Sequence, residues 1–213
     1  MQEAPDAMTT DDTDTDGLEA LSPEVGTADD GYMTGHLLVA SPAMPDPRFE
    51  KTVIYMCTHS ADGAMGLVIN RPFGGVSFAE LMQQLEVTGP LMPIDQPVLC
   101  GGPVESERGF VLHSSDYESE ATLGIEPGVS LTASFEILKA ISVGEGPKDQ
   151  LMVLGYAGWG AGQLDAELQD NGWLMVPGST ELIFHTPLDD KWERALASLG
   201  IDPRMMTSDI GHA

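Results

Sequence analysis

The segment whose residue types and spacing come nearest to a catalytic or binding loop is rich in glycine: GYAGWGAGQLDAEL, Gly155–Leu168. It follows the apolar run 151–154, and a strand, a glycine-rich turn and a helix start make the usual plan of a phosphate-binding loop. Gly155 and Gly160 match the first half of the P-loop pattern, but Ala161-Gly162 stands where the second half needs Lys and Ser/Thr. No ammonium would reach a γ-phosphate and no hydroxyl would hold magnesium, so the segment is not a P-loop.

The dinucleotide-binding pattern fails in the same segment. Gly158 and Gly160 need a third glycine three residues later, where Gln163 stands. Asp165 falls in the first turn of the predicted helix, where a carboxylate suits the helix dipole but repels a phosphate. We therefore interpret the segment as a tight strand-to-helix turn in which small residues let backbones approach. Trp159 and Gln163 remain candidates for lining a pocket that takes a neutral or basic ligand.

Basic residues are scarce, and two arginines stand at the ends of predicted strands. The chain has 9 Lys and Arg against 34 Asp and Glu, a formal net charge of −25. Arg71 follows Asn70 at a strand end, and Arg108 precedes a strand. Either guanidinium could bind a carboxylate or phosphate with two hydrogen bonds, although internal ion pairing is the stronger default in so acidic a chain. If the turns at 70–72, 101–104 and 155–163 meet, the candidate ligand site comprises Asn70, Arg71, Arg108, Trp159 and Gln163.

The sequence offers no complete catalytic or metal-binding pattern. Neither G-x-S-x-G nor H-E-x-x-H occurs, so the common hydrolase signatures are missing. Cys57 and His59 form the closest metal-like pair, because alternate residues of a strand share a face, but no second pair accompanies them. A buried, unreactive thiol is the better interpretation of Cys57. We predict no catalytic residue, no metal site and no cofactor, and the sequence favours a protein that is not an enzyme.

Short apolar runs separated by glycine and proline predict strands, and helices stand singly between groups of strands. This arrangement lacks strict strand–helix alternation and favours the α+β class. Ser77 and Glu80 form a capping box at the start of one helix, and apolar residues follow at helical spacing. The predicted strands are 37–40, 52–57, 66–70, 98–100, 110–113, 151–156, 173–176 and 181–184, and further helices are predicted at 134–141, 163–170 and 188–199.

The chain divides into an acidic N-terminal tail, residues 1–31, and a single domain, residues 32–213. The first 30 residues hold ten carboxylates and few large apolar side chains, so the tail is predicted to be disordered. Residues 31–213 carry 24 acids against 9 bases, so the domain is acidic in its own right. Such a charge repels nucleic acid and anionic membranes, and it favours solubility and basic protein partners. Two cysteines without a CxxC spacing, no signal peptide and no membrane-length apolar run favour a cytoplasmic location.

Three long segments resemble the YqgE/AlgH family of bacterial proteins and occur in the family's order. They are SPAMPDPRFEKTVIYMCTHSADGAMGLVINRP (41–72), CGGPVESERGFVLHSSDY (100–117) and VLGYAGWGAGQLDAELQDNGWL (153–174), and the likeness extends over residues 32–213. The resemblance implies an α+β fold in which helices flank a small closed β-barrel or a curved mixed sheet. At Ser134-Phe135-Glu136 the family usually has Ser-Arg-Asp, so any anion site that used this arginine is in doubt here. The resemblance brings no activity and no catalytic or ligand residues, although one branch is labelled as a transcriptional regulator linked to alginate production.

Three functions are compatible with these patterns. The first is a non-enzymatic cytoplasmic regulatory or adaptor protein with a protein partner, in agreement with the acidic surface and the missing catalytic motifs. The second is a direct nucleic-acid binder, which rests on the family label alone and is opposed by the charge and by the lack of a basic helix. The third is a small-molecule or nucleotide-binding protein, or an enzyme, with its site at the glycine-rich turns. The sequence determines neither the oligomeric state nor the ligand.

Overall fold

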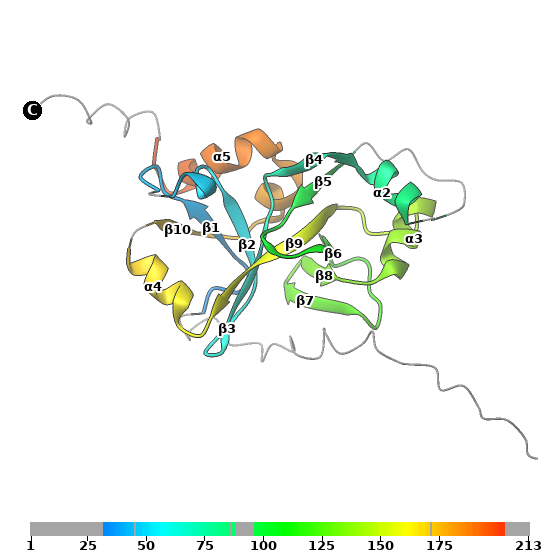
Figure 1. The fold of residues 1–213 in the computed structure, drawn as a ribbon, viewed down its shortest axis with the longest axis horizontal. Helices are drawn as coiled ribbons and strands as arrows, with labels where there is room; N and C mark the ends of the chain where they lie inside the picture. Colours follow the sequence, from blue (N-terminus) through cyan, green and yellow to red (C-terminus); the bar gives the residue numbers. More distant parts are fainter. Residues whose placement is uncertain (1–31, 45, 86, 88–95, 171, 203–213) are drawn as a thin grey trace, which may run out of the picture.

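The computed structural model describes residues 32–44, 46–85, 87, 96–170 and 172–202, and the predicted tail, residues 1–31, lies outside them. Figure 1 shows one continuous, bent sheet with helices packed around it. The strands are β1 (His36–Ala40), β2 (Val53–Ser60), β3 (Gly63–Val68), β4 (Pro72–Ser77), β5 (Pro97–Cys100), β6 (Val104–Ser114), β7 (Thr122–Glu126), β8 (Val129–Thr132), β9 (Gln150–Gly160) and β10 (Trp173–Pro177). The α-helices are α2 (Phe78–Gln84), α3 (Phe135–Val143), α4 (Gln163–Gln169) and α5 (Lys191–Ser198), with the 3-10 helices η1 (Pro47–Phe49) and η3 (Leu188–Asp190) and the π-helix η2 (Glu181–His185).

The sheet is mixed and strongly curled. Neighbouring strands follow the order β10-β1-β2-β3-β9-β6-β8-β7, and all of these pairs are antiparallel. Strand β4 pairs with β5, and β5 runs parallel to the first half of β9. The predicted α+β class is confirmed. Of the two forms implied by the family resemblance, the described residues adopt the curved mixed sheet, since β7 and β10 end the strand path without pairing to each other.

Strand β9 belongs to both halves of the sheet, and its bend depends on glycine. Its first half pairs with β5 and β6, and its second half pairs with β3. Between the two halves Gly155 has φ +70°, and a Cβ there would stand 2.6 Å from the carbonyl oxygen of Gly102. Only glycine combines this conformation with so close an approach. The strand predicted at 151–156 is therefore longer in the structure and ends at Gly160. Of the predicted glycine-rich turn, only Ala161-Gly162 forms a turn.

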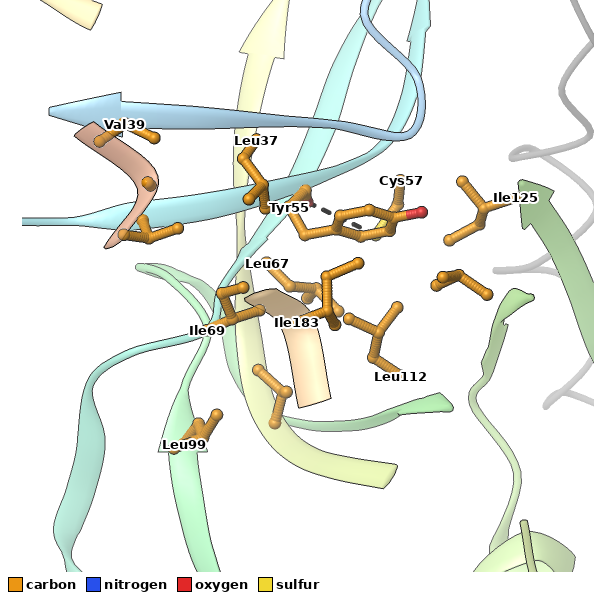
Figure 2. Packing of buried hydrophobic residues seen from close by; sticks show 14 of the residues in the cluster. Leu37, Val39, Tyr55, Cys57, Leu67, Ile69, Leu99, Leu112, Ile125 and Ile183 are labelled. Atoms are coloured by element: carbon orange, nitrogen blue, oxygen red, sulfur yellow. Dashed lines mark hydrogen bonds between the residues drawn. The ribbon is translucent and has the colours of Figure 1, made fainter. Parts of the chain in front are cut away.

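Alternation of side chains along the strands creates one central apolar cluster and two outer ones. The central cluster lies inside the curl, where Leu67, Leu112 and Ile183 come together from separate elements (Figure 2). Helix α4 contributes Leu164 to one outer cluster, and α2 and α3 pack on the other. Helix α5 packs Trp192 into the central cluster. The helices therefore fix the curvature of the sheet from both sides.

The helix that the capping signal predicts is confirmed, and one predicted strand is wrong. At the start of α2, the Glu80 N–H donates to the Ser77 hydroxyl (3.2 Å), and the Ser77 N–H donates to the Glu80 carboxylate (2.8 Å). The predicted strand 181–184 forms the π-helix η2 instead, because Ile183 turns into the core and the Thr186 N–H donates to the Glu181 carbonyl. In the ranges that the structure describes, no helix has the length and hydropathy to span a bilayer.

Candidate functional site

Asn70 and Arg71, two of the predicted site residues, lie just beyond β3 and hold backbone segments together. The Asn70 Oδ1 accepts from the Val53 N–H (2.9 Å), and its Nδ2 donates to the Lys51 carbonyl (2.8 Å). The Arg71 guanidinium donates to the Glu50 carbonyl (2.9 Å). Both side chains therefore fasten the turn before β2 to the end of β3.

Arg108 forms the internal ion pair that we weighed against ligand binding. Its Nη1 donates to the Glu105 carboxylate (2.9 Å), and its guanidinium lies over the Phe110 ring at 5.3 Å. The second oxygen of Glu105 accepts from the Tyr156 hydroxyl (3.4 Å). The charge of Arg108 is thereby balanced within an irregular stretch of β6, where Glu105 has φ +45°.

Trp159 and Gln163 form a third group, centred on Glu167, which sequence reasoning missed. The Trp159 Nε1–H and the Gln163 Nε2–H each donate to one oxygen of the Glu167 carboxylate, both at 3.0 Å. The Gln163 Oε1 accepts from the Gly160 N–H (3.1 Å). These contacts attach the start of α4 to the end of β9. Glu167 lies one helical turn after Gln163, and this spacing is the signal that could have identified it.

The turns that carry these residues contact one another through their backbones. The Cys100 N–H donates to the Arg71 carbonyl (2.8 Å), and the Gly101 N–H donates to the Leu154 carbonyl (2.8 Å). A Cβ at Gly101 would collide with the carbonyl oxygen of Gly155. The glycines of the motif turns therefore allow close backbone approach.

The five predicted side chains fall into three groups, each held by its own intramolecular hydrogen bonds. The Arg71 backbone lies across Cys100-Gly101 from Leu154, in the middle of β9, whereas Trp159 and Gln163 lie at the Gly160 end of this strand. Six residues of strand, up to roughly 20 Å, separate these two positions. Every one of the five has an intramolecular partner, and ligand binding by any of them stays a prediction.

The metal-like pair is separated by an irregularity in β2. The register of β2 against β3 shifts between Met56 and Thr58. Cys57 consequently faces the central cluster, where its Sγ donates to the Tyr55 carbonyl (3.8 Å; Figure 2). Burial raises the pKa of the Cys57 thiol, which agrees with an unreactive side chain. Among the described residues, no three His, Cys, Asp or Glu side chains gather in a way that could hold a metal ion.

His59, the other member of that pair, contacts the opposite side of the sheet. Its Nδ1 accepts from the Met33 N–H (3.2 Å), and its Nε2 lies 4.0 Å from the Asp165 carboxylate on α4. Burial lowers the pKa of His59, against an opposing effect of Asp165. His59 thus joins the start of the domain to α4.

A cavity with a different set of polar side chains lies beside the π-helix, and sequence reasoning did not find it. It has a volume of about 230 Å³ and lies between the starts of β5 and β9 and the segment 184–191. We call it the π-helix cavity. Its polar lining is Gln96, Gln150, His185, Thr186 and Lys191.

Lys191 is the most unusual of these residues, because its side chain is 1 % exposed in a chain with few basic residues. The Nζ donates to the Leu182 carbonyl (2.8 Å) and the Ile183 carbonyl (2.5 Å), and burial lowers its pKa to about 8. No carboxylate pairs with Lys191 in the part of the chain that the structure describes. The available signal was a lysine one turn before Ala195, on the apolar face of the last helix.

His185 stands at the rim of the cavity between two carboxylates. Its Nε2 lies 3.0 Å from Asp149, and its Nδ1 lies 3.4 Å from Glu181. The hydrogen bond that the His185 imidazole donates to Asp149 is the main cause that raises the pKa of His185, and Glu181 adds to it. The His185 imidazole, held between two carboxylates, therefore keeps its proton more firmly than usual.

Gln150, another residue that lines this cavity, has one buried acceptor without a partner. Its Nε2 donates weakly to the Gln96 Oε1 (3.4 Å), whereas its Oε1 is buried and has no hydrogen-bond partner. A buried polar atom without a partner destabilises the folded state, so native structures contain few of them.

Comparison with known proteins places this chain among bacterial relatives that it matches over most of their length. Residues 37–204 match a family model described as AlgH-like. A UPF0301 protein of Rhodospirillum rubrum is 53 % identical over 184 residues, which cover 86 % of this chain and 96 % of the relative. A UPF0301 protein of Afipia carboxidovorans is 48 % identical over 205 residues, which cover 92 % and 98 %.

Two solved structures share the fold. The solution structure of the AlgH protein from Pseudomonas aeruginosa is 42 % identical, with a TM-score of 0.71, and the match covers 88 % of this chain and 99 % of that protein. The crystal structure of protein DIP2367 from Corynebacterium diphtheriae is 18 % identical, with a TM-score of 0.66 over 83 % of this chain and 92 % of that one. The second likeness concerns the fold alone.

Proposed function

We propose that this chain, which belongs to the AlgH-like family, is a cytoplasmic, non-enzymatic regulatory or adaptor protein that acts by binding another protein. The support comes from the charge that the fold leaves on its surface and from the internal use of the motif residues. Asn70, Arg71, Arg108, Trp159 and Gln163 all make contacts that hold backbone segments or helices together. Such contacts stabilise the fold. An adaptor needs a stable fold and a surface that binds its partner, and it does not need a reaction centre.

The observation that carries this proposal is the internal use of positive charge. Most basic side chains of the described residues are engaged within the fold. They are Arg48, Arg108 and Lys148, paired with carboxylates; Lys51 and Lys139, over aromatic rings; Arg71, bonded to a carbonyl; and the buried Lys191. The charge left outside is mainly carboxylate, and a surface of this kind attracts basic protein surfaces.

Helix α5 offers a defined place to test the proposal. A shallow hollow of about 540 Å³ lies along it, with Asp190, Glu193, Arg194 and Asp202 in its lining. Three carboxylates against one guanidinium give this hollow a net negative charge, which suits a basic segment of a partner. Asp189, which precedes Asp190 in the chain, is also exposed to solvent.

The experiment compares two variants with the same change in net charge. Asp189→Asn/Asp190→Asn/Glu193→Gln neutralises the α5 face, and Glu118→Gln/Glu120→Gln/Glu126→Gln neutralises exposed carboxylates elsewhere. The tagged full-length chain is cross-linked in cells that naturally produce it, and the captured proteins are identified by mass spectrometry. We expect a specific partner that the α5 variant loses and the control retains. Equal capture by both variants would refute the role of the α5 face, and an enzymatic turnover lost in a point variant would refute the adaptor function.

The surface charge argues against direct binding to nucleic acid, which the regulator label of the family would suggest. Acidic side chains far outnumber basic ones in this chain, 34 against 9, so its net field repels phosphates and we expect no shift of DNA or RNA at low salt. Binding whose affinity falls steeply with salt concentration would support a nucleic-acid partner and overturn the preference for a protein.

A further inference from the structure

The first residues of the domain are attached to it through the imidazole of His59. We propose that His59 is an acid-sensitive switch, whose neutral imidazole holds Tyr32 and Met33 on the domain and whose protonated form releases them. These two residues, here called the N-terminal anchor, connect the acidic tail, residues 1–31, to the segment that leads into β1. The inference is independent of the adaptor function, because it concerns only how the domain holds its own start.

The contact with Met33 determines which nitrogen of His59 carries the proton. The Nδ1 of His59 accepts from the Met33 N–H (3.2 Å). A backbone N–H can only donate, so Nδ1 is unprotonated and the single proton of the neutral imidazole lies on Nε2. A protonated imidazole has N–H donors at both nitrogens. Protonation of His59 and the hydrogen bond from Met33 therefore exclude each other.

Burial of both partners gives this exclusion a structural consequence. His59 is 7 % exposed and Met33 is 8 % exposed. A buried donor that loses its acceptor destabilises the folded state unless water reaches it. Movement of the N-terminal anchor away from His59 would let water accept from both the Met33 N–H and the new N–H of the imidazole.

The hydrogen bonds next to the N-terminal anchor limit this movement. The His59 N–H donates to the Thr34 Oγ1 (3.0 Å), and the Gly35 N–H donates to the Met56 carbonyl (2.8 Å). Neither bond involves the imidazole, so protonation leaves both in place. Tyr32, in contrast, is 39 % exposed, and its ring meets the imidazole edge-on with 5.1 Å between the ring centroids. Release is therefore confined to the two residues of the N-terminal anchor.

Asp165 on α4 is the charged group that faces the imidazole. Its carboxylate lies 4.0 Å from the His59 Nε2 and favours the protonated form, whereas burial favours the neutral form. Burial has the larger effect and lowers the pKa of His59, because the Asp165 side chain is 54 % exposed and water screens its charge. Strand β3, which pairs with β2 beside His59, contains no titratable residue, and Tyr32 is the titratable residue of the N-terminal anchor.

The direction of the pH dependence follows from these groups. In the released form the imidazole is exposed to water and regains its ordinary pKa of 6.5. Between this value and the lowered pKa of the attached form, the released form binds more protons. The ratio of released to attached anchor should therefore rise by up to about tenfold for each pH unit of acidification in this window. Above pH 6.5 this ratio should be constant.

NMR of the ¹⁵N-labelled full-length chain tests the switch in two steps. Long-range ¹H–¹⁵N spectra at about pH 7.5 identify the protonated ring nitrogen of His59. We expect the proton on Nε2, and a proton on Nδ1 would overturn the proposal. Between about pH 7.5 and 5, the order parameter of the Met33 amide should then fall from ~0.85 towards ~0.6, while that of Gly35 stays high. An unchanged order parameter of Met33 over this range would overturn the proposal, whether or not His59 titrates.

Variants at two positions separate the switch from a general effect of acid. His59→Asn removes the titration and keeps an acceptor, because the asparagine Oδ1 takes the place of Nδ1. We expect Met33 to stay rigid down to about pH 5 in this variant. Asp165→Asn removes the charge that favours protonation, so release should need a lower pH. Its matched control is Asp170→Asn, the same change at the exposed end of α4, which should release the anchor at the wild-type pH.

Two results with these variants would overturn the proposal. One is the same pH dependence of Met33 in His59→Asn and wild type. The other is release at the same pH in Asp165→Asn and Asp170→Asn. If His59→Asn does not fold, the titration of the unchanged chain and the two aspartate variants still decide.

Discussion

Replacing Lys191 by methionine should change how the stability of this protein depends on pH. Lys191 is 1 % exposed, and burial lowers its pKa from 10.5 to about 8. Between these two values the folded chain has released the proton that the unfolded chain still holds. Because the unfolded state then binds more protons, the free energy of unfolding contributed by Lys191 rises with pH in this window. Below pH 8 the full cost of burying the ammonium is present.

The size of the effect follows from the difference in pKa. A fall from 10.5 to about 8 corresponds to roughly 3 kcal/mol at ~1.36 kcal/mol for each pH unit. Methionine avoids this cost but removes the Lys191 donor from the Leu182 and Ile183 carbonyls, at up to about 1–3 kcal/mol each. We expect the two opposing contributions to give the variant a stability within about 3 kcal/mol of wild type at neutral pH. Wild type should then gain about 3 kcal/mol over the variant as the pH reaches 10.5.

Urea unfolding of both proteins, from neutral pH to 10.5, measures this difference. Tyr55 and Cys57 have raised pKa values in the folded chain, and their effect on stability runs in the opposite direction. Both proteins contain these two residues, so the comparison isolates Lys191. A free-energy difference between wild type and variant that stays constant over the whole range would refute the buried ammonium.

Three further predictions concern other parts of the fold. Ser77→Ala removes the hydroxyl cap of α2 and should lower the free energy of unfolding by about 1 kcal/mol, and an unchanged urea midpoint would contradict it. Gly155→Ala meets both the φ of +70° and a carbonyl oxygen 2.6 Å away, so it should cost more than about 2 kcal/mol. Gly124→Ala, with open space around its Cβ, serves as the control, and its melting temperature should stay close to wild type. Asp149→Asn removes the main cause that raises the pKa of His185, so an NMR titration should find that pKa lowered. An unaltered titration would show that Asp149 does not hold the imidazole proton.

Elements with strong local signals could be predicted from the sequence, and elements that depend on distant contacts could not. The capping box at Ser77 fixed the start of α2, and a regular apolar stripe through Trp192 revealed α5. The end of β9 was missed because its glycines look like a turn, whereas they allow a bent strand to pass close to the segment around Gly102. The run 181–184 has strand-like composition, but its conformation depends on Ile183 in the core and on a lysine several residues later.

The candidate site shows the same limit. Asn70, Arg71 and Arg108 were correctly noted as polar groups at strand ends, but their partners are carbonyls and carboxylates that no local pattern reveals. The two groups that now define a cavity, Gln150 and Lys191, are about forty residues apart, and neither belongs to a recognised motif. Only the packing of the π-helix against β9 brings them to one wall.

Stability bears differently on the two polar side chains of this cavity. At neutral pH a methionine in place of Gln150 would bury no unpartnered oxygen. Lys191, by contrast, offsets part of the cost of its burial by donating to two carbonyls, which would lose this donor in a methionine variant. Gln150→Met should accordingly unfold at the same or a higher urea concentration than wild type. A lower urea midpoint would assign Gln150 to the scaffold, since its contact with Gln96 would then outweigh the unsatisfied oxygen.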